Sequence, residues 1–376
     1  MSIKTERLIS RAKKLIKKGE IEQAKKIYLN ILKSFPNNQD ATKGMKLLEK
    51  GEKIHPTKAQ LDEVMRLYST SQMNEALEKV ELLIKDYPNE HLLFNICGAC
   101  YSEIGSLELA IENFKKAISI KIDYAEAQYN LGVAYQKINK LDSATEFYQL
   151  AISSQHAYPT AHNNLGIIFL NENQLDSAVK CFEWAIAYSP NYAEAHNNLG
   201  SALQELKQFE NAKKEFEMAT SLNQNYAQAF HNLGIICEII NEPKEAIAHY
   251  EKTIQINPEF AEAYRNLSKL KKLKAKDSYV SQILSLYSRE NLNLSDKARL
   301  GFALAEINKN LGNQDEYFKY LNEGNRLRKE EINYSFEESN NFHSIITTLF
   351  GFDQPVVKNS SKHASNIKPI FIIGMP

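Results

Sequence analysis

Small, aromatic and polar positions recur along residues 91–270 with a period of 34 residues. Each of five repeats carries a glycine, an alanine twelve residues later and an aromatic residue four positions after that alanine. The spacing predicts two helices per repeat, because small residues let helix backbones approach closely and a large ring fills the space beside them. The glycines are Gly98, Gly132, Gly166, Gly200 and Gly234, and the aromatic residues are Phe114, Tyr148, Phe182, Phe216 and Tyr250.

One pair of helices cannot bury its apolar face alone, so the repeats are expected to stack into an all-α superhelix with a long concave side. Earlier copies of the pattern cover residues 5–38 and 57–90, and the residues between them are expected to hold one extra helix. A sixth copy begins at residue 261 and then loses the pattern. The full repeats cover residues 91–124, 125–158, 159–192, 193–226 and 227–260.

The repeat pattern becomes degenerate after residue 294, and the chain changes from helical to polar and loop-like after Phe352. Residues 295–352 are interpreted as a degenerate helical cap, the polar residues 353–368 as a linker, and the apolar residues 369–376 as a buried strand. Because a lone strand cannot fold by itself, we expect the chain to stop just inside a second, α/β domain. Two further domains are predicted before these segments. Residues 1–56 hold an N-terminal repeat with its extra helix, and residues 57–294 form the superhelix.

The order of leucine-glycine, aromatic, alanine, aromatic and proline within 34 residues resembles the tetratricopeptide-repeat family. Pro190 and Pro258 supply the proline in two of the repeats. The resemblance implies that positions 2, 6, 9 and 13 of the first helix in each repeat line a groove, and helical spacing places these positions on one face. It also implies that the superhelix is right-handed and that its partner is an extended peptide or protein segment.

Composition narrows the class of protein. Lys plus Arg equals Asp plus Glu at 46 each, which argues against a dedicated nucleic-acid-binding protein. The sequence contains no apolar run long enough to cross a membrane and no apolar signal core at its start, so we expect no membrane span and a cytoplasmic location. Cys97 and Cys100 form a CxxC motif within a predicted helix, and we interpret them as buried apolar residues because no second CxxC completes a metal site.

An asparagine occupies position 6 in five successive copies of the repeat. Asn95 lies one place early in the preceding repeat, where Ile96 holds the position. A carboxamide can donate to and accept from a peptide backbone, so a row of them could hold an extended peptide with little regard for its side chains. The row resembles the asparagine ladder of O-linked N-acetylglucosamine transferase, although the asparagines could instead bond neighbouring helices within the chain. Its members are Asn130, Asn164, Asn198, Asn232 and Asn266.

Two other features of this face exclude particular partners. Position 2 reads Glu126, Thr160, Glu194, Gln228 and Glu262, so the lysine with which chaperone-binding tetratricopeptide domains hold a carboxylate is missing. His162, His196 and His231 recur near position 4, but equivalent residues of successive repeats should lie roughly 10 Å apart. Metal–nitrogen bonds of about 2 Å cannot bridge that distance, so we interpret these histidines as packing or surface residues.

Residues 1–368 contain no phosphate-binding loop, nucleophile elbow or zinc-binding HExxH motif. The segment GNRLR, followed later by PIFIIGMP, resembles bacterial proteins that join a tetratricopeptide arm to a domain similar to tyrosylprotein sulfotransferases. That resemblance implies 3′-phosphoadenosine-5′-phosphosulfate as the cofactor of a domain beyond residue 376. Gly374 and Pro376 would then begin its incomplete phosphate loop, and this chain would have no catalytic residues of its own. The arm of a P-loop nucleotide hydrolase and a stand-alone interaction scaffold are the alternatives.

Overall fold

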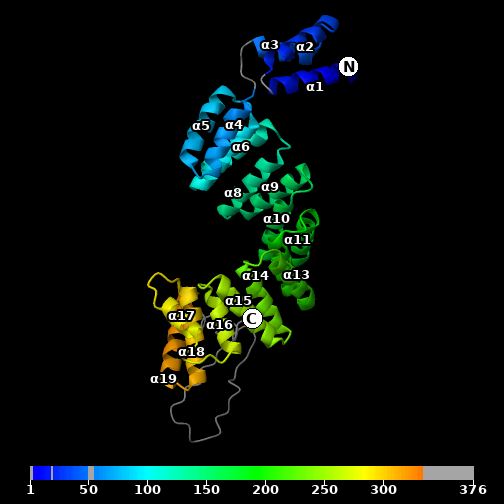
Figure 1. Ribbon diagram of the computed structural model, residues 1–376. Coiled ribbons are helices and arrows are strands. Elements are labelled where there is room, and N and C mark those ends of the chain that lie inside the picture. The colour runs from blue at the N-terminus through cyan, green and yellow to red at the C-terminus, as the bar shows by residue number, and fades with distance from the viewer. Residues whose placement is uncertain (1–2, 18–19, 50–54, 333–376) are drawn as a thin grey trace, which may run out of the picture. The chain divides into compact units, whose positions relative to one another are not determined.

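The computed structural model describes residues 3–17, 20–49 and 55–332, and every regular element in these ranges is an α-helix (Figure 1). The expected all-α solenoid of helical hairpins is therefore confirmed. The strand expected at residues 369–376, with Gly374 and Pro376, lies outside the described residues. None of the described helices is both long enough and apolar enough to cross a membrane.

The chain divides into two compact units, residues 1–257 and 258–376, which we describe separately. The first unit begins with helices α1 to α5, which lie before the five full repeats (Figure 1). Of these, α3 falls in the interval where one extra helix is expected. The bounds are α1 (Ile3–Lys17), α2 (Ile21–Ser34), α3 (Gln39–Glu49), α4 (Lys58–Ser69) and α5 (Met73–Asp86).

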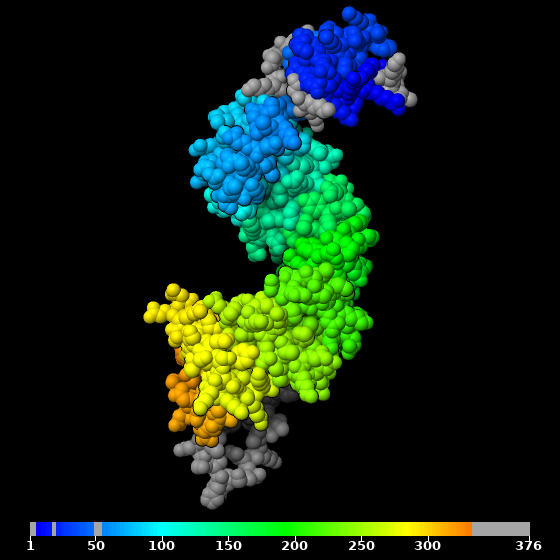
Figure 2. Space-filling view, viewed as in Figure 1, coloured from blue at the N-terminus to red at the C-terminus, as the bar shows by residue number. Residues whose placement is uncertain are grey.

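Each of the five full repeats forms one antiparallel pair of helices, and each pair packs against the next. Figure 2 shows these repeats in continuous contact, from cyan through green. The first helices are α6 (His91–Ile104), α8 (Ala125–Lys137), α10 (Pro159–Asn171), α12 (Ala193–Glu205) and α14 (Ala227–Ile239). The second helices are α7 (Leu107–Ile120), α9 (Leu141–Ser154), α11 (Leu175–Tyr188), α13 (Phe209–Leu222) and α15 (Pro243–Ile256).

The glycine of each repeat packs directly against the aromatic ring of the same repeat. A methyl group added at any of these glycines would lie 2.6 or 2.7 Å from a carbon of that ring, closer than atoms can approach. The rings of Phe114, Tyr148, Phe182, Phe216 and Tyr250 are almost completely buried. The periodic glycines therefore exist because the second helix places a large ring against the backbone of the first.

The turn between the two helices of a repeat contains one residue in the left-handed region. Gly105, Asn139, Asn173 and Asn241 occupy this place with φ between 56° and 89°, and Lys207 does so at 59°. Glycine and asparagine adopt this conformation more readily than other residues. A uniform turn gives every hairpin the same geometry, so the first helices present equivalent positions to the same side.

The second unit contains four described helices, α16 (Ala261–Leu270), α17 (Ser278–Tyr287), α18 (Leu294–Leu311) and α19 (Gln314–Glu331). The two long helices α18 and α19 form a hairpin whose turn contains Gly312 at φ 77°. At Gly324 an added methyl group would lie 2.9 Å from the ring of Phe302. The close glycine–ring approach of the regular repeats thus recurs in the segment that was expected to be degenerate.

Candidate functional site

The asparagines at position 6 lie half-buried on α8, α10, α12 and α14 of the first unit. Each donates a hydrogen bond from its Nδ2 to the side chain of the residue 35 positions earlier, which belongs to the preceding repeat. Asn266 lies on α16 in the second unit, where it is 8% exposed. The donor–acceptor pairs are Asn130 to Asn95 at 3.0 Å, Asn164 to Tyr129 at 3.2 Å, Asn198 to Asn163 at 3.0 Å and Asn232 to Asn197 at 3.0 Å.

The acceptors of these bonds form a second row, at position 5, that the sequence analysis missed. Asn95, Asn163 and Asn197 in this row are buried, and Tyr129 is half-buried. Asn95, which seemed to interrupt the series, is the acceptor for Asn130. The signal was present in the adjacent pairs Asn163-Asn164 and Asn197-Asn198. The two rows together make a polar seam that joins successive first helices.

The seam uses only part of the hydrogen-bonding capacity of the position-6 asparagines. A carboxamide has two N–H donors and an oxygen with two lone pairs, and each inter-repeat bond consumes one donor. The oxygen of Asn232 accepts from Gln228 Nε2 at 2.9 Å, and that of Asn198 accepts from Asn197 Nδ2 at a long 3.4 Å. The structure therefore demonstrates bonding within the chain, while contact with a peptide stays a prediction.

A row of tyrosines borders the seam, one residue before each of four first helices: Tyr124, Tyr158, Tyr192 and Tyr226. All four are half-buried, and their 34-residue recurrence was visible in the sequence but not used. Asn95 Nδ2 lies 3.3 Å from the Tyr124 hydroxyl, and the rings of Tyr129 and Tyr158 are 5.1 Å apart. Burial raises the pKa of Tyr158 to about 12, with smaller contributions from Glu126 and Tyr129. These hydroxyls therefore stay protonated and can donate hydrogen bonds.

Carboxylates stand at the exposed edge of this surface. Glu126 and Glu194, at position 2, are exposed, and Asn95 donates to Glu126 at 3.1 Å. Asn163 lies 3.4 Å from Glu194. No ion pair to Lys, Arg or His involves Glu126 or Glu194 within the part of the chain that the structure describes. We call positions 2, 5 and 6 of the first helices α6 to α14, together with the preceding tyrosines, the tyrosine–asparagine surface. This surface therefore carries negative charge that no ion pair neutralises.

The three histidines near position 4 are buried, as their interpretation as packing residues requires. Nδ1 of His196 lies 2.7 Å from the Glu215 carboxylate and its Nε2 lies 3.1 Å from the Pro190 carbonyl oxygen. His162 has only a carbonyl contact, from Nε2 to His156 at 3.2 Å, and stacks near Tyr188. The rings of His162 and His196 are thus each held between a carbonyl group of the preceding repeat and a side chain of their own repeat.

Cys97 and Cys100 are 2% and 0% exposed on α6, in agreement with their interpretation as apolar core residues. Burial raises the pKa of Cys97 to about 12 and that of Cys100 to about 11. Both are therefore protonated thiols at neutral pH, which makes them poor nucleophiles. Among the described residues, neither belongs to a group of three potential metal ligands.

Three family models of tetratricopeptide repeats match the chain, over four ranges. A repeat model matches residues 98–139 and 168–207, a second matches residues 191–259 and a third matches residues 125–156. None of the curated proteins searched matches the chain.

Several solved structures have a similar arrangement of helices. YrrB, a repeat protein with an unusual peptide-binding site, is 21% identical, with a TM-score of 0.43 over 49% of this chain and 95% of its own. PilF of Pseudomonas aeruginosa is 19% identical, with a TM-score of 0.47 over 62% of this chain and 97% of its own. The C-terminal part of a repeat protein from Cytophaga hutchinsonii is 18% identical, with a TM-score of 0.47 over 69% and 98%.

Proposed function

We propose that this chain, whose residues 98–156 and 168–259 match models of tetratricopeptide repeats, is a protein-interaction module. Its tyrosine–asparagine surface binds an extended, positively charged peptide segment. The observation that carries the proposal is the coincidence of three rows on the first helices. Half-buried carboxamides and half-buried tyrosine rings recur there every 34 residues, and carboxylates without an ion-pair partner stand beside them in alternate repeats, at Glu126 and Glu194.

The carboxamides supply contacts to a backbone. Asn198 and Asn232 lie one repeat apart, and each keeps a second N–H donor beyond its bond to the preceding repeat. Asn164 does not, because its Nδ2 also donates to the Tyr148 hydroxyl at 3.4 Å. An extended peptide rises about 3.3 Å per residue, so about three residues span the roughly 10 Å between successive helix pairs. Every third residue of a peptide that lies along the surface could therefore contact one asparagine.

The tyrosines and carboxylates select the charge of the bound segment. Tyrosine faces attract cations, and within this chain Lys121 Nζ already lies 5.2 Å from the centroid of the Tyr124 ring. Glu126 and Glu194 add negative potential at the rim, which should speed the encounter with a basic segment and repel an acidic one. The missing position-2 lysine, which argued against an acidic chaperone tail, fits the same preference.

The test compares labelled peptides of equal length that are rich in Lys and Arg, in Asp and Glu, or in Gly and Ser. We expect fluorescence anisotropy to show binding of the basic peptide, weakening as salt rises because the charges are exposed. Glu194→Lys should weaken this binding about tenfold or more, whereas Glu183→Gln, exposed on α11, should leave it unchanged. Equal binding of all three peptides, or an unaffected Glu194→Lys protein, would contradict the charge preference.

The contribution of the asparagines needs a separate test, because they also join the repeats. Replacing Asn164, Asn198 and Asn232 together by alanine should abolish peptide binding. Circular dichroism and a thermal melt must show that the protein is still folded at the assay temperature. Unchanged affinity in a folded triple variant would remove the asparagines from the proposal and leave only the tyrosines and carboxylates.

A second proposal is that the chain is the substrate-binding arm of a sulfotransferase. Its support is the sequence alone: GNRLR lies on α19, and PIFIIGMP, with Gly374 and Pro376 as the start of a phosphate loop, lies outside the described residues. If the reading frame continues past codon 376 into Arg-Ser-Gly-Thr-Thr, the product should transfer ³⁵S from 3′-phosphoadenosine-5′-phosphosulfate to a hydroxyl of the bound peptide. A continuation into Gly-Lys-Thr, or no label in the peptide, would reject this proposal.

A further inference from the structure

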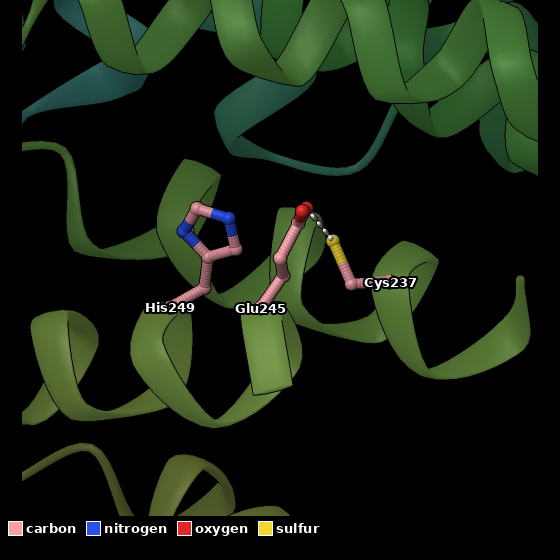
Figure 3. Close-up of side chains that lie close together, drawn as sticks. All are labelled: Cys237, Glu245 and His249. Atoms are coloured by element: carbon pink, nitrogen blue, oxygen red, sulfur yellow. Dashed lines mark hydrogen bonds between the residues drawn. The ribbon is translucent and has the colours of Figure 1, made fainter. Parts of the chain in front are cut away.

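Three potential metal ligands converge in the last full repeat of the first unit. The thiol of Cys237, the carboxylate of Glu245 and the imidazole of His249 have ligand atoms that all lie within 4.8 Å of one another. Figure 3 shows the Glu245 carboxylate between the thiol and the imidazole, and the Cys237 Sγ lies 3.8 Å from Glu245 Oε2. These are the three kinds of side chain that bind zinc in proteins.

The helical hairpin explains how the three side chains meet. Glu245 and His249 are four residues apart on α15, so both project from one face of that helix. Cys237 comes from α14, on the other side of the turn that contains Asn241 in the left-handed conformation. Cys237 is completely buried, His249 is half-buried and Glu245 is exposed. The cluster thus has a rigid inner donor and a path to solvent.

The corresponding positions in the other repeats show that the fold does not require these residues. Where this repeat has Cys237 and His249, the repeat at 125–158 has Tyr135 and Phe147, whose rings stack 5.7 Å apart. The repeats at 159–192 and 193–226 have Phe169 with Cys181 and Leu203 with Glu215. Packing between the helices is satisfied there without a thiol, carboxylate and imidazole together.

We propose that Cys237, Glu245 and His249 form a zinc-binding site with one coordination position left for water or an outside ligand. Zinc bonds are about 2.3 Å to sulfur and about 2.0–2.2 Å to nitrogen and oxygen, so ligand atoms around one ion lie roughly 3.5 Å apart. The required closure is about 1 Å, and the exposed Glu245 side chain can supply it. A thiolate favours zinc over magnesium or calcium, which prefer oxygen ligands.

The neighbouring charges are compatible with a divalent ion. Lys213 Nζ donates to Glu242 Oε2 at 2.5 Å and to Glu245 Oε2 at 3.0 Å. On zinc binding, Lys213 releases Glu245 and keeps Glu242, while the Cys237 thiol loses its proton to solvent as the zinc–sulfur bond forms. The net charge of the site is then zero, because the two carboxylates and the Cys237 thiolate balance the zinc ion and the Lys213 ammonium.

Cobalt and zinc titrations of the reduced full chain test the site. We expect about one cobalt ion per chain, with the near-ultraviolet charge-transfer absorption of a cobalt–thiolate bond, and displacement of cobalt by zinc. Zinc should also raise the melting temperature, since it binds the folded state. The Cys237→Ser protein should lose the charge-transfer band. Glu245→Gln and His249→Gln should weaken cobalt binding about 100-fold or more, because even the loss of a residue that only hydrogen-bonds to a metal ligand lowers metal affinity about 10–100-fold.

Cys181→Ser is the matched control, because Cys181 occupies the position equivalent to His249 two repeats earlier. It should bind cobalt as the unaltered protein does. Absence of the charge-transfer band in the unaltered protein, or its persistence in a folded Cys237→Ser protein, would overturn the proposal. If Cys237→Ser does not fold, unchanged affinity in Glu245→Gln and His249→Gln, which alter side chains less deeply buried, would overturn it equally.

Discussion

His162 and His196 occupy the same position in neighbouring repeats and are both buried, yet their environments shift their pKa values in opposite directions. For His196, burial by itself lowers the pKa. The hydrogen bonds to Glu215 and to the Pro190 carbonyl oxygen raise the pKa by more than burial lowers it, so the net shift is upward. For His162, burial dominates the carbonyl contact from His156, and the pKa is lowered. The difference comes from Glu215, which faces only His196.

Nuclear magnetic resonance titration should find the pKa of His196 above, and that of His162 below, the usual value of about 6.5. Glu215→Gln should lower the pKa of His196 and leave that of His162 unchanged. The stabilisation from His196 is complete below its unfolded pKa and is lost as pH rises through its raised value. That from His162 is present above its unfolded pKa and is lost as pH falls. Shifts in the same direction would show that Glu215 is not the cause.

At the scale of an element, the glycine–ring contact fixes the distance between the two helices of a repeat. A Gly166→Ala methyl group would lie 2.6 Å from the Phe182 ring, which is completely buried and cannot move aside. The strain should exceed the gain in helix propensity of about 1 kcal/mol, with a net destabilisation of about 1–3 kcal/mol. Urea unfolding followed by circular dichroism measures it.

Gly301→Ala on α18 is the control for this prediction. An added methyl group there would meet nothing closer than the Tyr320 carbonyl oxygen at 3.5 Å, an ordinary contact. Alanine should then stabilise the helix by about 0.5–1 kcal/mol. Equal effects of the two substitutions would mean that the ring in the repeat gives way.

The helices were predictable from the sequence because one 34-residue pattern places glycine and aromatic residues on facing helices. The polar seam was not, because its bonds join position 6 to position 5 of the preceding repeat. Asn198 and Asn163 are separated by 35 residues, and an alignment of equivalent positions hides that offset. The Cys237–Glu245–His249 cluster occurs in one repeat only, so periodicity carried no signal for it.

At the scale of the molecule, each repeat contacts its neighbours in sequence, so damage to the seam should stay local. Asn163→Ala removes the acceptor of Asn198 and the donor to Glu194, and leaving the Asn198 amide without its partner should cost about 1–3 kcal/mol. Hydrogen exchange measured by mass spectrometry should accelerate in α10 and α12 and stay unchanged in α4 and α5.

Asn171→Ala, an exposed change on the same helix α10, controls for the loss of an asparagine as such and should leave exchange unaltered. Faster exchange throughout residues 55–257 in the Asn163→Ala protein would instead show that the first unit unfolds as one cooperative body. Such a result would remove the basis for treating each repeat as an independent structural unit.

The 35-residue reach of the seam bonds also limits how this gene can change in length. Duplicating or deleting one whole 34-residue module among residues 125–226 would give each position-6 amide a position-5 acceptor again, because position 5 is Asn95, Tyr129, Asn163 or Asn197 in the repeats involved. Recombination between these modules can therefore lengthen or shorten the array without leaving a polar group unpaired. An insertion of any other size inside a first helix would move the position-6 asparagines out of register with the position-5 acceptors. The number of residues in this repeat array should therefore change during evolution by whole 34-residue modules.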